Sequence, residues 1–169
     1  MAENRISIYK AQRATAREML TLWGYKNIEE APPTTAFFYN TIQSGNAVFW
    51  SLRDGDEIIG ELYGFSELED KDFADGKTTA YLCAFRVKKE YRGQGCGSIL
   101  METALSELKK MGFRHATIGV GMTEMDNQKM YHHMGFRNER KECFFDPCAR
   151  DKDGKPMADE GFILLSKEL

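Results

Sequence analysis

The sequence predicts a mixed α+β fold, within the broad α/β class, in which helices flank a central twisted sheet. Two features of the chain support this prediction. In its first half, β-rich runs follow one another around a hairpin turn, and its middle then has a strand, a helix and a second strand in succession. The 169 residues, of which 42% are hydrophobic and 29% charged, are enough for one well-packed core. We therefore expect residues 1–169 to form a single domain.

The N-terminal quarter is predicted to contain a short strand and two helices. Residues 6–8 alternate in hydrophobicity, as in a strand, and apolar side chains recur at helical spacing over residues 11–23. Pro32 and Pro33 interrupt the helical pattern, because proline cannot continue a helix. Helical spacing resumes over residues 34–44.

A β-hairpin is predicted next. Residues 47–52 and 57–65 are two β-rich runs, and the Asp-Gly pair between them supplies the positive-φ positions that a tight turn needs. The polar and acidic residues 66–77 follow. Residues 78–87 then form a further strand, which we expect to pair with residues 57–65.

The clearest helix covers residues 97–111, whose apolar side chains recur at helical spacing and which ends at Gly112. The rest of the chain is predicted to hold a strand, a short helix and two further strands, at residues 115–120, 126–134, 142–146 and 161–166.

The composition argues against several classes of partner. The net charge is −3 and the pI about 5.7, with no basic stripe to neutralise nucleic-acid phosphates. The first residues lack the apolar stretch of a signal peptide, and no run of about 18 apolar residues could span a membrane. Neither the cysteines (Cys83, Cys96, Cys143 and Cys148) nor the three histidines match a zinc pattern. We expect a cytoplasmic protein with reduced thiols, no metal, and neither nucleic acid nor membrane as partner.

A glycine-rich segment, residues 92–98, joins the strand at 78–87 to the clearest helix. Glycine permits positive φ, and its lack of a side chain lets a ligand approach the backbone closely. The first turn of the following helix adds unpaired N–H groups and a partial positive charge. An anion, most naturally a pyrophosphate, is the expected ligand.

Three other interpretations of this segment compete. A P-loop for nucleoside triphosphates requires a Gly-Lys-Ser/Thr ending, and Gly97 is followed by Ser98 and Ile99 instead. A dinucleotide fingerprint requires G-x-G-x-x-G in an opening βαβ unit, whereas Gly93, Gly95 and Gly97 alternate in mid-chain. The third interpretation is a glycine turn that binds nothing.

Two ordered motifs carry a family resemblance. The first is Arg92-Gly-Gln-Gly-Cys-Gly97, with Val87-Lys-Lys-Glu-Tyr91 leading into it, and the second is Met130-Tyr131-His-His-Met-Gly-Phe136. The first is similar to the R/Q-x-x-G-x-G/A signature of the GNAT superfamily of N-acyltransferases. The second is similar to that family's leucine-tyrosine pair followed by apolar-Gly-Phe, at a fitting distance. The resemblance covers residues 78–136 and implies a mixed, mostly antiparallel sheet.

The resemblance implies acetyl-CoA as co-substrate, with its pyrophosphate on the amides of residues 92–97. The pantetheine arm would pair like an added strand with the backbone of residues 85–87, where the strand at 78–87 parts from its neighbour. Where the family often has an asparagine, seven residues before the tyrosine, this chain has Glu124, and Asn127 is a substitute candidate. The predicted cofactor-binding residues are Phe85, Arg86, Val87, Arg92, Gly93, Gln94, Gly95, Cys96, Gly97, Ser98 and Asn127.

By the same resemblance, the Tyr131 hydroxyl donates a proton to the leaving thiolate, although this tyrosine could instead only pack the helix against the core. The acceptor amine must lose a proton before it attacks, so a base is expected near the end of the strand at 78–87. Glu61 is the first candidate, and alternation along its strand could equally turn it to solvent. Glu124, Tyr81 and Glu67 compete for this role.

Two further groups are given no role in the chemistry. Cys96 is interpreted as an inert thiol, because no histidine stands near it in sequence and direct transfer needs no acyl-enzyme. His132 and His133 point in different directions from a helix, so they do not form a two-histidine metal face.

The leading hypothesis is an N-acetyltransferase that acts in a ternary complex on a primary amine, either a small molecule or a peptide or protein N-terminus or lysine. A non-catalytic acyl-CoA-binding or regulatory module on the same fold is the alternative, and a nucleotide-binding domain is a third. The acceptor pocket is expected from residues 22–44 and 66–77. Acidic residues in the second stretch favour a cationic amine or form a solvated loop. Exposed C-terminal strand edges allow a homodimer.

Overall fold

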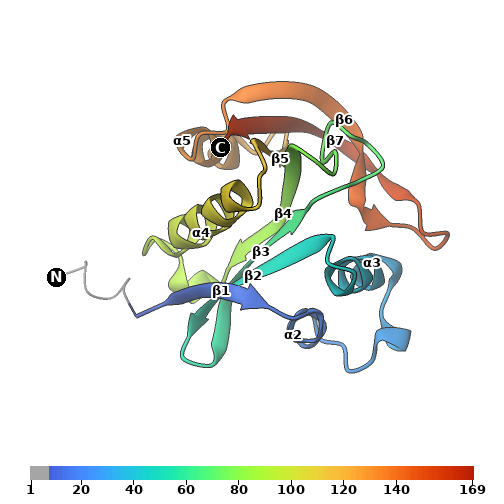
Figure 1. The fold of residues 1–169 in the computed structure, drawn as a ribbon, viewed down its shortest axis with the longest axis vertical. Coiled ribbons are helices and arrows are strands. Elements are labelled where there is room, and N and C mark those ends of the chain that lie inside the picture. The colour runs from blue at the N-terminus through green and yellow to red at the C-terminus, as the bar shows by residue number, and fades with distance from the viewer. Residues whose placement is uncertain (1–7) are drawn as a thin grey trace.

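A computed structural model describes residues 8–169, so most of the strand expected at residues 6–8 lies outside the described residues (Figure 1). The described chain forms a seven-stranded sheet of order β1-β2-β3-β4-β5-β7-β6, in which only β4 and β5 are parallel neighbours. The strands are β1 (Lys10–Ala14), β2 (Ala47–Asp54), β3 (Glu57–Phe65), β4 (Thr79–Val87), β5 (His115–Gly121), β6 (Asn138–Arg150) and β7 (Pro156–Glu168). The predicted mixed α+β class with a mostly antiparallel sheet is confirmed.

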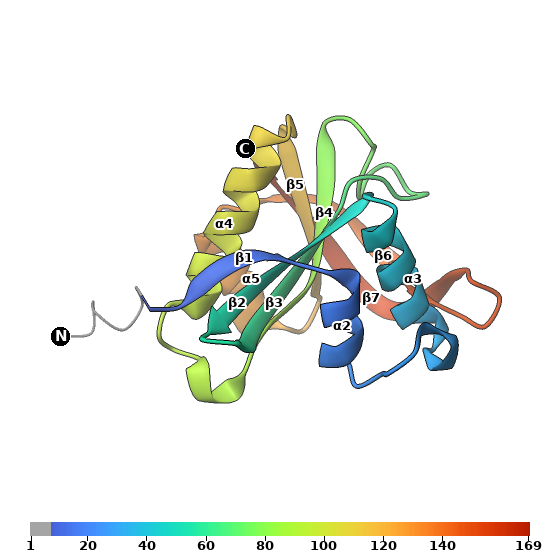
Figure 2. The same ribbon diagram turned by 60° about the horizontal axis from the view of Figure 1, so that its bottom comes forward.

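Helices cover both faces of this sheet (Figures 1 and 2). The helices α4 (Cys96–Lys110) and α5 (Met125–His133) lie on one side, and α2 (Ala16–Leu22) and α3 (Pro33–Gln43) lie on the other. Short 3-10 turns at Ile28–Glu30 and Lys89–Tyr91 complete the helical segments. No helix among residues 8–169 is long and apolar enough to cross a lipid bilayer.

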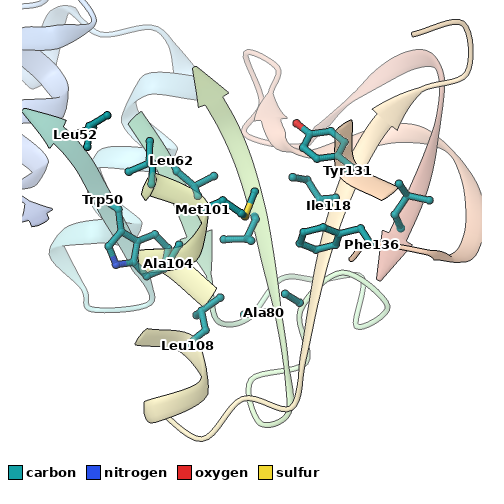
Figure 3. Packing of buried hydrophobic residues seen from close by; sticks show 14 of the residues in the cluster. Trp50, Leu52, Leu62, Ala80, Met101, Ala104, Leu108, Ile118, Tyr131 and Phe136 are labelled. Atoms are coloured by element: carbon teal, nitrogen blue, oxygen red, sulfur yellow. The ribbon is translucent and has the colours of Figure 1, made fainter. Parts of the chain in front are cut away.

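Each face has its own buried apolar cluster. Under α4, side chains such as Leu100 and Leu108 pack against Trp50 and Leu62 of the sheet, and Phe136 and Tyr131 extend this cluster beneath α5 (Figure 3). On the opposite face, a second cluster joins Phe38 of α3 to aromatic side chains of the sheet such as Phe49 and Phe65, and it includes Phe73 from the loop after β3. Burial of this apolar surface is the main force that holds the helices on the sheet.

The sheet opens between its two parallel strands. Residues Thr79 to Leu82 of β4 pair with His115 to Ile118 of β5, and beyond these four pairs the two strands part. At the same point Ala84 has a positive φ of 52°, and the β3–β4 register shifts. A bulge of this kind bends its strand and leaves ladder groups without partners. The second half of β4 therefore exposes main-chain donors and acceptors on the side toward β5.

One predicted element is wrong at the N-terminus. Residues 11–14 belong to strand β1, which pairs with β2, and only α2 is helical within the predicted 11–23 helix. The boundary is a capping box, in which Thr15 accepts from the Glu18 N–H and the Glu18 carboxylate accepts from the Thr15 N–H. Such a box fixes the start of a helix, so the residues before Thr15 are free to pair as a strand.

The other predicted elements are found with shifted ends. The hairpin β2–β3, the β3–β4 pairing and the helices α3, α4 and α5 are confirmed within one to two residues at most ends. The two C-terminal strands are 13 residues each, far longer than the predicted 142–146 and 161–166. Together they form a long antiparallel hairpin whose register shifts at three places.

Candidate active site

The glycine-rich segment begins α4 with its backbone amides unpaired. Gly93 and Gly95 have φ of 74° and 82°, and Gly95 is the N-cap of the helix. No main-chain carbonyl of the described residues accepts a hydrogen bond from the N–H groups of residues 93–98, whereas the Ile99 N–H donates to the Gly95 carbonyl. The helix N-terminus adds partial positive charge at the same place. This geometry suits an anionic group that needs several donors.

A cavity of about 590 Å³ lies between this segment, β4 and α5; we call it the cofactor cavity. Ten of the eleven residues predicted to bind the cofactor line it: Phe85, Arg86, Val87, Arg92, Gly93, Gly95, Cys96, Gly97, Ser98 and Asn127. The cavity joins the unpaired amides of the helix N-terminus to the open main chain of β4. It therefore offers an elongated ligand a charged end and a strand-like edge.

Gln94 is the exception among the predicted residues. Its amide Nε2 donates to the Glu90 carbonyl, and its Oε1 lies 3.5 Å from the Tyr9 hydroxyl, away from the cavity lining. Three lining residues were missed, namely Tyr91, Met130 and Met134. The two methionines are four residues apart, one helical turn, so their spacing together with Asn127 could have indicated a shared face of α5.

The two candidates for the family's asparagine lie in different places. Asn127 lines the cofactor cavity. Glu124 does not, because its carboxylate accepts a hydrogen bond from the Gly121 N–H at 2.8 Å and lines a different cavity beyond the end of β5. Of the two, Asn127 is the residue in a position to contact a ligand of the cofactor cavity.

Tyr131 lies on α5, beneath the opening between β4 and β5. Its side chain is 9% exposed, and its ring packs edge-on against Phe136 (Figure 3). Burial raises the pKa of Tyr131 to about 12, and the nearby Glu124 carboxylate and Cys83 thiol act in the same direction. The hydroxyl therefore keeps its proton at neutral pH, as a general acid must.

Glu61 is buried on β3 rather than turned to solvent, with 7% exposure. The Trp23 indole N–H donates to its Oε1 at 3.1 Å, and an Arg86 guanidinium nitrogen lies 3.4 Å from the same oxygen. Burial raises the pKa of Glu61, and Arg86 and Trp23 partly oppose this. Glu61 lines a small cavity of about 190 Å³ that shares Arg86 and Val87 with the cofactor cavity.

The remaining candidates for the base lie in different parts of the structure. Glu67 is exposed and forms an ion pair with Lys71 at 2.8 Å, in the loop after β3. Tyr81 and Glu124 both line the cavity beyond the end of β5.

Cys96 is 2% exposed, and burial raises the pKa of its thiol, which disfavours a reactive thiolate.

A second cavity, of about 610 Å³, includes Tyr81 and Phe162 in its lining, and these two residues belong to the apolar cluster of the α2–α3 face; we call it the acidic cavity. Its carboxylates come from four positions, and its wall also includes Tyr81, main chain at the end of β5 and Phe162. The carboxylates are Glu124, Asp146, Asp159 and Glu160. No lysine, arginine or histidine of the described chain lines this cavity. Among residues 8–169, no three His, Cys, Asp or Glu side chains are grouped to hold a metal ion.

The acidic loop after β3 differs from this cavity, because its carboxylates are paired. Asp70 and Asp72 both contact Lys141, at 2.6 and 3.0 Å. Glu69 contacts Arg150 at 3.3 Å. The negative charge that the sequence places in this loop is therefore largely neutralised within the molecule.

The fold and the motifs agree with known proteins. The sequence profile of the Acetyltransferase (GNAT) family matches residues 13–136. A GNAT family acetyltransferase from Elizabethkingia anophelis, solved with acetyl-CoA bound, is 18% identical with a TM-score of 0.62, over 96% of this chain and 99% of that one. Ribosomal-protein-S18-alanine N-acetyltransferase from Escherichia coli is 17% identical with a TM-score of 0.67, over 95% and 93%. No curated protein sequence matches the chain. At these identities, the solved structures show a shared fold.

Proposed function

The chain belongs to the GNAT family of acetyltransferases, and from this premise we propose that it is an N-acetyltransferase that moves the acetyl group of acetyl-CoA to a primary amine. The observation that carries the proposal is the cofactor cavity, in which unpaired amides at a helix N-terminus adjoin the open edge of β4. The acetyl-CoA bound to the Elizabethkingia anophelis protein of the same fold supports the choice of co-substrate.

The chain's own groups suit the parts of coenzyme A. The N–H groups of residues 93–98 would hold the pyrophosphate, and the Arg92 guanidinium, whose Nε donates to the Val87 carbonyl at 2.9 Å, adds a fixed positive charge. The main chain of Phe85 to Val87 would pair with the amides of the pantetheine arm. A Cβ on Gly97 would lie 3.1 Å from the Phe85 ring, so glycine keeps this cradle open.

Two proton transfers complete the proposed reaction. The amine nitrogen attacks the acetyl carbonyl carbon, the carbon–sulfur bond breaks, and the thiolate takes a proton from the Tyr131 hydroxyl. Glu61 lines neither of the two large cavities, so the amine's own proton would pass to it through water. Burial favours this role, because it raises the pKa of Glu61 above the usual glutamate value and so makes the carboxylate a stronger base.

The test is thiol release from acetyl-CoA on addition of amines from several classes, namely small amines, peptides with a free N-terminus and peptides with lysine. We expect thiol release that depends on the amine, with a matching acetylated product by mass spectrometry. Binding of acetyl-CoA without turnover for every amine would favour a non-catalytic acyl-CoA-binding module instead. Displacement of bound coenzyme A by ATP or NAD would favour a nucleotide-binding domain.

Replacement of Glu61 by glutamine should lower kcat about tenfold or more, because a positioned base contributes at least that much. In the wild type, kcat/KM should rise with pH through a pKa above the usual glutamate range, since the base works only when it has lost its proton. The Gln variant should lack this rise. Pre-steady-state rates from pH 5 to 9 measure both effects, with Glu67→Gln as the exposed, matched control. An unchanged pH profile in Glu61→Gln, with loss of the rise in Glu124→Gln, would assign the base to Glu124.

A further inference from the structure

We infer that the acidic cavity is the acceptor site and that it selects amines that carry a second cationic group. This inference rests on the proposed transferase function and names its substrate class. The cavity is lined by Tyr81 of β4, the end of β5 and the segment before α5, and by residues of the β6–β7 hairpin. The loops that sequence analysis expected to form the acceptor site contribute none of its lining residues.

The charge of this cavity is uncompensated within residues 8–169. None of its four carboxylates forms a salt bridge, whereas the loop carboxylates Asp70, Asp72 and Glu69 all do. Asp146 and Asp159 instead accept hydrogen bonds from main-chain N–H groups, at 2.8 to 3.2 Å. These bonds fix the direction of each carboxylate and leave its negative charge available. Four such charges around one concavity concentrate cations there.

An independent observation points to a ligand in the same place. Tyr81 is 5% exposed, lines the cavity, and its hydroxyl forms no hydrogen bond with any residue from 8 to 169. That hydroxyl lies 3.3 Å from the position that a Cβ on Gly119 would occupy, so it faces the cavity wall at the end of β5. Burial, above all, raises the pKa of Tyr81, so the neutral phenol keeps its lone pairs and its proton for a partner. The hydroxyl oxygen is not fully enclosed by protein, so a bound ammonium in the cavity can donate to it and supply the partner that residues 8–169 do not.

The spread of the carboxylates favours an extended cation. They stand at three separate parts of the wall, on the segment before α5, on β6 and on β7, and no three acidic, histidine or cysteine side chains of the described chain are close enough to hold a metal ion. A single ammonium can contact only part of this wall. A second cationic nitrogen a few bonds away can contact the rest while the first, reacting amine loses its proton.

The cavity also reaches the reacting atoms. Glu124 lines it and at the same time lies close enough to Tyr131 to raise the pKa of that phenol. The thiol of Cys83, at the β4 bulge, lies close to both Tyr81 and Tyr131. The acidic cavity therefore lies near Tyr131, whose helix α5 also carries Asn127 and Met130 of the cofactor cavity. An amine held in the first can meet an acetyl group held in the second.

The test compares 1,4-diaminobutane with 1-aminobutane, which share a reacting amine and differ in the second charge. We expect kcat/KM for the diamine to exceed that for the monoamine by up to about fivefold at low salt, since one partly exposed ion pair contributes at most about this factor. The ratio should fall as the salt concentration rises. A third arm measures kcat/KM for a peptide with two adjacent lysines. A higher value for the peptide than for the diamine would identify a basic polypeptide as the dicationic acceptor, and a lower value would identify a free diamine.

Two isosteric substitutions test the site itself. Asparagine keeps the oxygen that accepts the main-chain N–H groups, so Asp146→Asn and Asp159→Asn should fold normally. Together they should reduce the ratio of kcat/KM for the diamine to kcat/KM for 1-aminobutane by up to about fivefold, because the diamine loses the partner of its second charge. Asp153→Asn is the control, because Asp153 is exposed in the turn of the same hairpin and outside the cavity lining. The Asp153→Asn variant should have the same ratio of kcat/KM for the diamine to kcat/KM for the monoamine as the wild type.

The outcomes separate this inference from the proposed function. Equal kcat/KM for the two amines, or an unchanged preference in the double variant, overturns the inference and leaves the transferase intact. Absence of thiol release with every amine overturns the proposed transferase function. In that case calorimetry measures the binding of the diamine to the coenzyme A-saturated protein and tests the cation site independently of turnover. Diamine binding that weakens in the double variant but not in Asp153→Asn supports the site, and equal binding in all three proteins overturns it.

Discussion

Replacement of Tyr131 by phenylalanine should lower kcat about a hundredfold or more and leave the Kd of acetyl-CoA nearly unchanged. A positioned general acid contributes roughly this factor. The ring contact with Phe136 is kept, and the lost hydroxyl forms no hydrogen bond with residues 8–169, so the fold should not change. Stopped-flow thiol release and calorimetric binding of acetyl-CoA measure the two quantities.

A matched control is Tyr39→Phe, because the Tyr39 hydroxyl only accepts from Gln43 on α3. It should behave as the wild type. The pKa of about 12 has a further consequence for the wild type, namely that kcat should not fall between pH 8 and 10 through loss of the Tyr131 proton. Equal losses in kcat and in acetyl-CoA affinity would speak against the acid role and for a packing role.

Replacement of Gly95 by valine should weaken acetyl-CoA binding about a hundredfold. Gly95 has a φ of 82° at the N-cap of α4, a conformation that a β-branched residue avoids. The variant would therefore move the unpaired N–H groups that follow it. Loss of two hydrogen bonds to a charged phosphate, at about 1.5 kcal/mol each, corresponds to this factor.

Gly112→Val is the control for this substitution. Gly112 has a φ of 101° just beyond the other end of α4, and no atom lies within 4 Å of a Cβ built there. Both variants should lose thermal stability, but only Gly95→Val should lose acetyl-CoA binding in calorimetry. Full affinity in Gly95→Val would remove the glycine-rich segment from the cofactor site.

Local signals predicted most of the middle of this fold. The Asp-Gly turn between β2 and β3, the apolar stripe of α4 and the glycines around residue 95 each act within a few residues of chain. The start of α2 is also marked locally, since Thr15 and Glu18 form a T-x-x-E capping box, whereas the apolar spacing before Thr15 favours a helix from residue 11. Ten of the eleven residues that these local motifs propose for cofactor binding line one cavity, and Gln94 does not.

The C-terminal hairpin and the acidic cavity could not be predicted in this way. Much of β6 and β7 is polar and exposed, so these strands lack the alternation that marks a half-buried strand, and pairing with one another defines them. Asp146 and Asp159 face one cavity only because of the register between the two strands, which bulges shift at three places. A shift of one residue turns every side chain of a strand to the other face. Sequence spacing alone does not specify that register.

β4 and β5 part after four residue pairs, and the surfaces on the two sides of this opening differ in how substitutions would affect ligand binding. On the α4 side, a ligand meets mostly main chain, whose hydrogen-bonding groups are the same whatever side chains are attached. On the hairpin side, it meets carboxylates, each of which a single codon change can remove or reverse in charge. With the acceptor site proposed above, new acceptors would arise by substitutions in β6 and β7 while the proposed donor side stays constant. The β6–β7 hairpin is accordingly the segment in which related proteins that use other acceptors should differ most from this one.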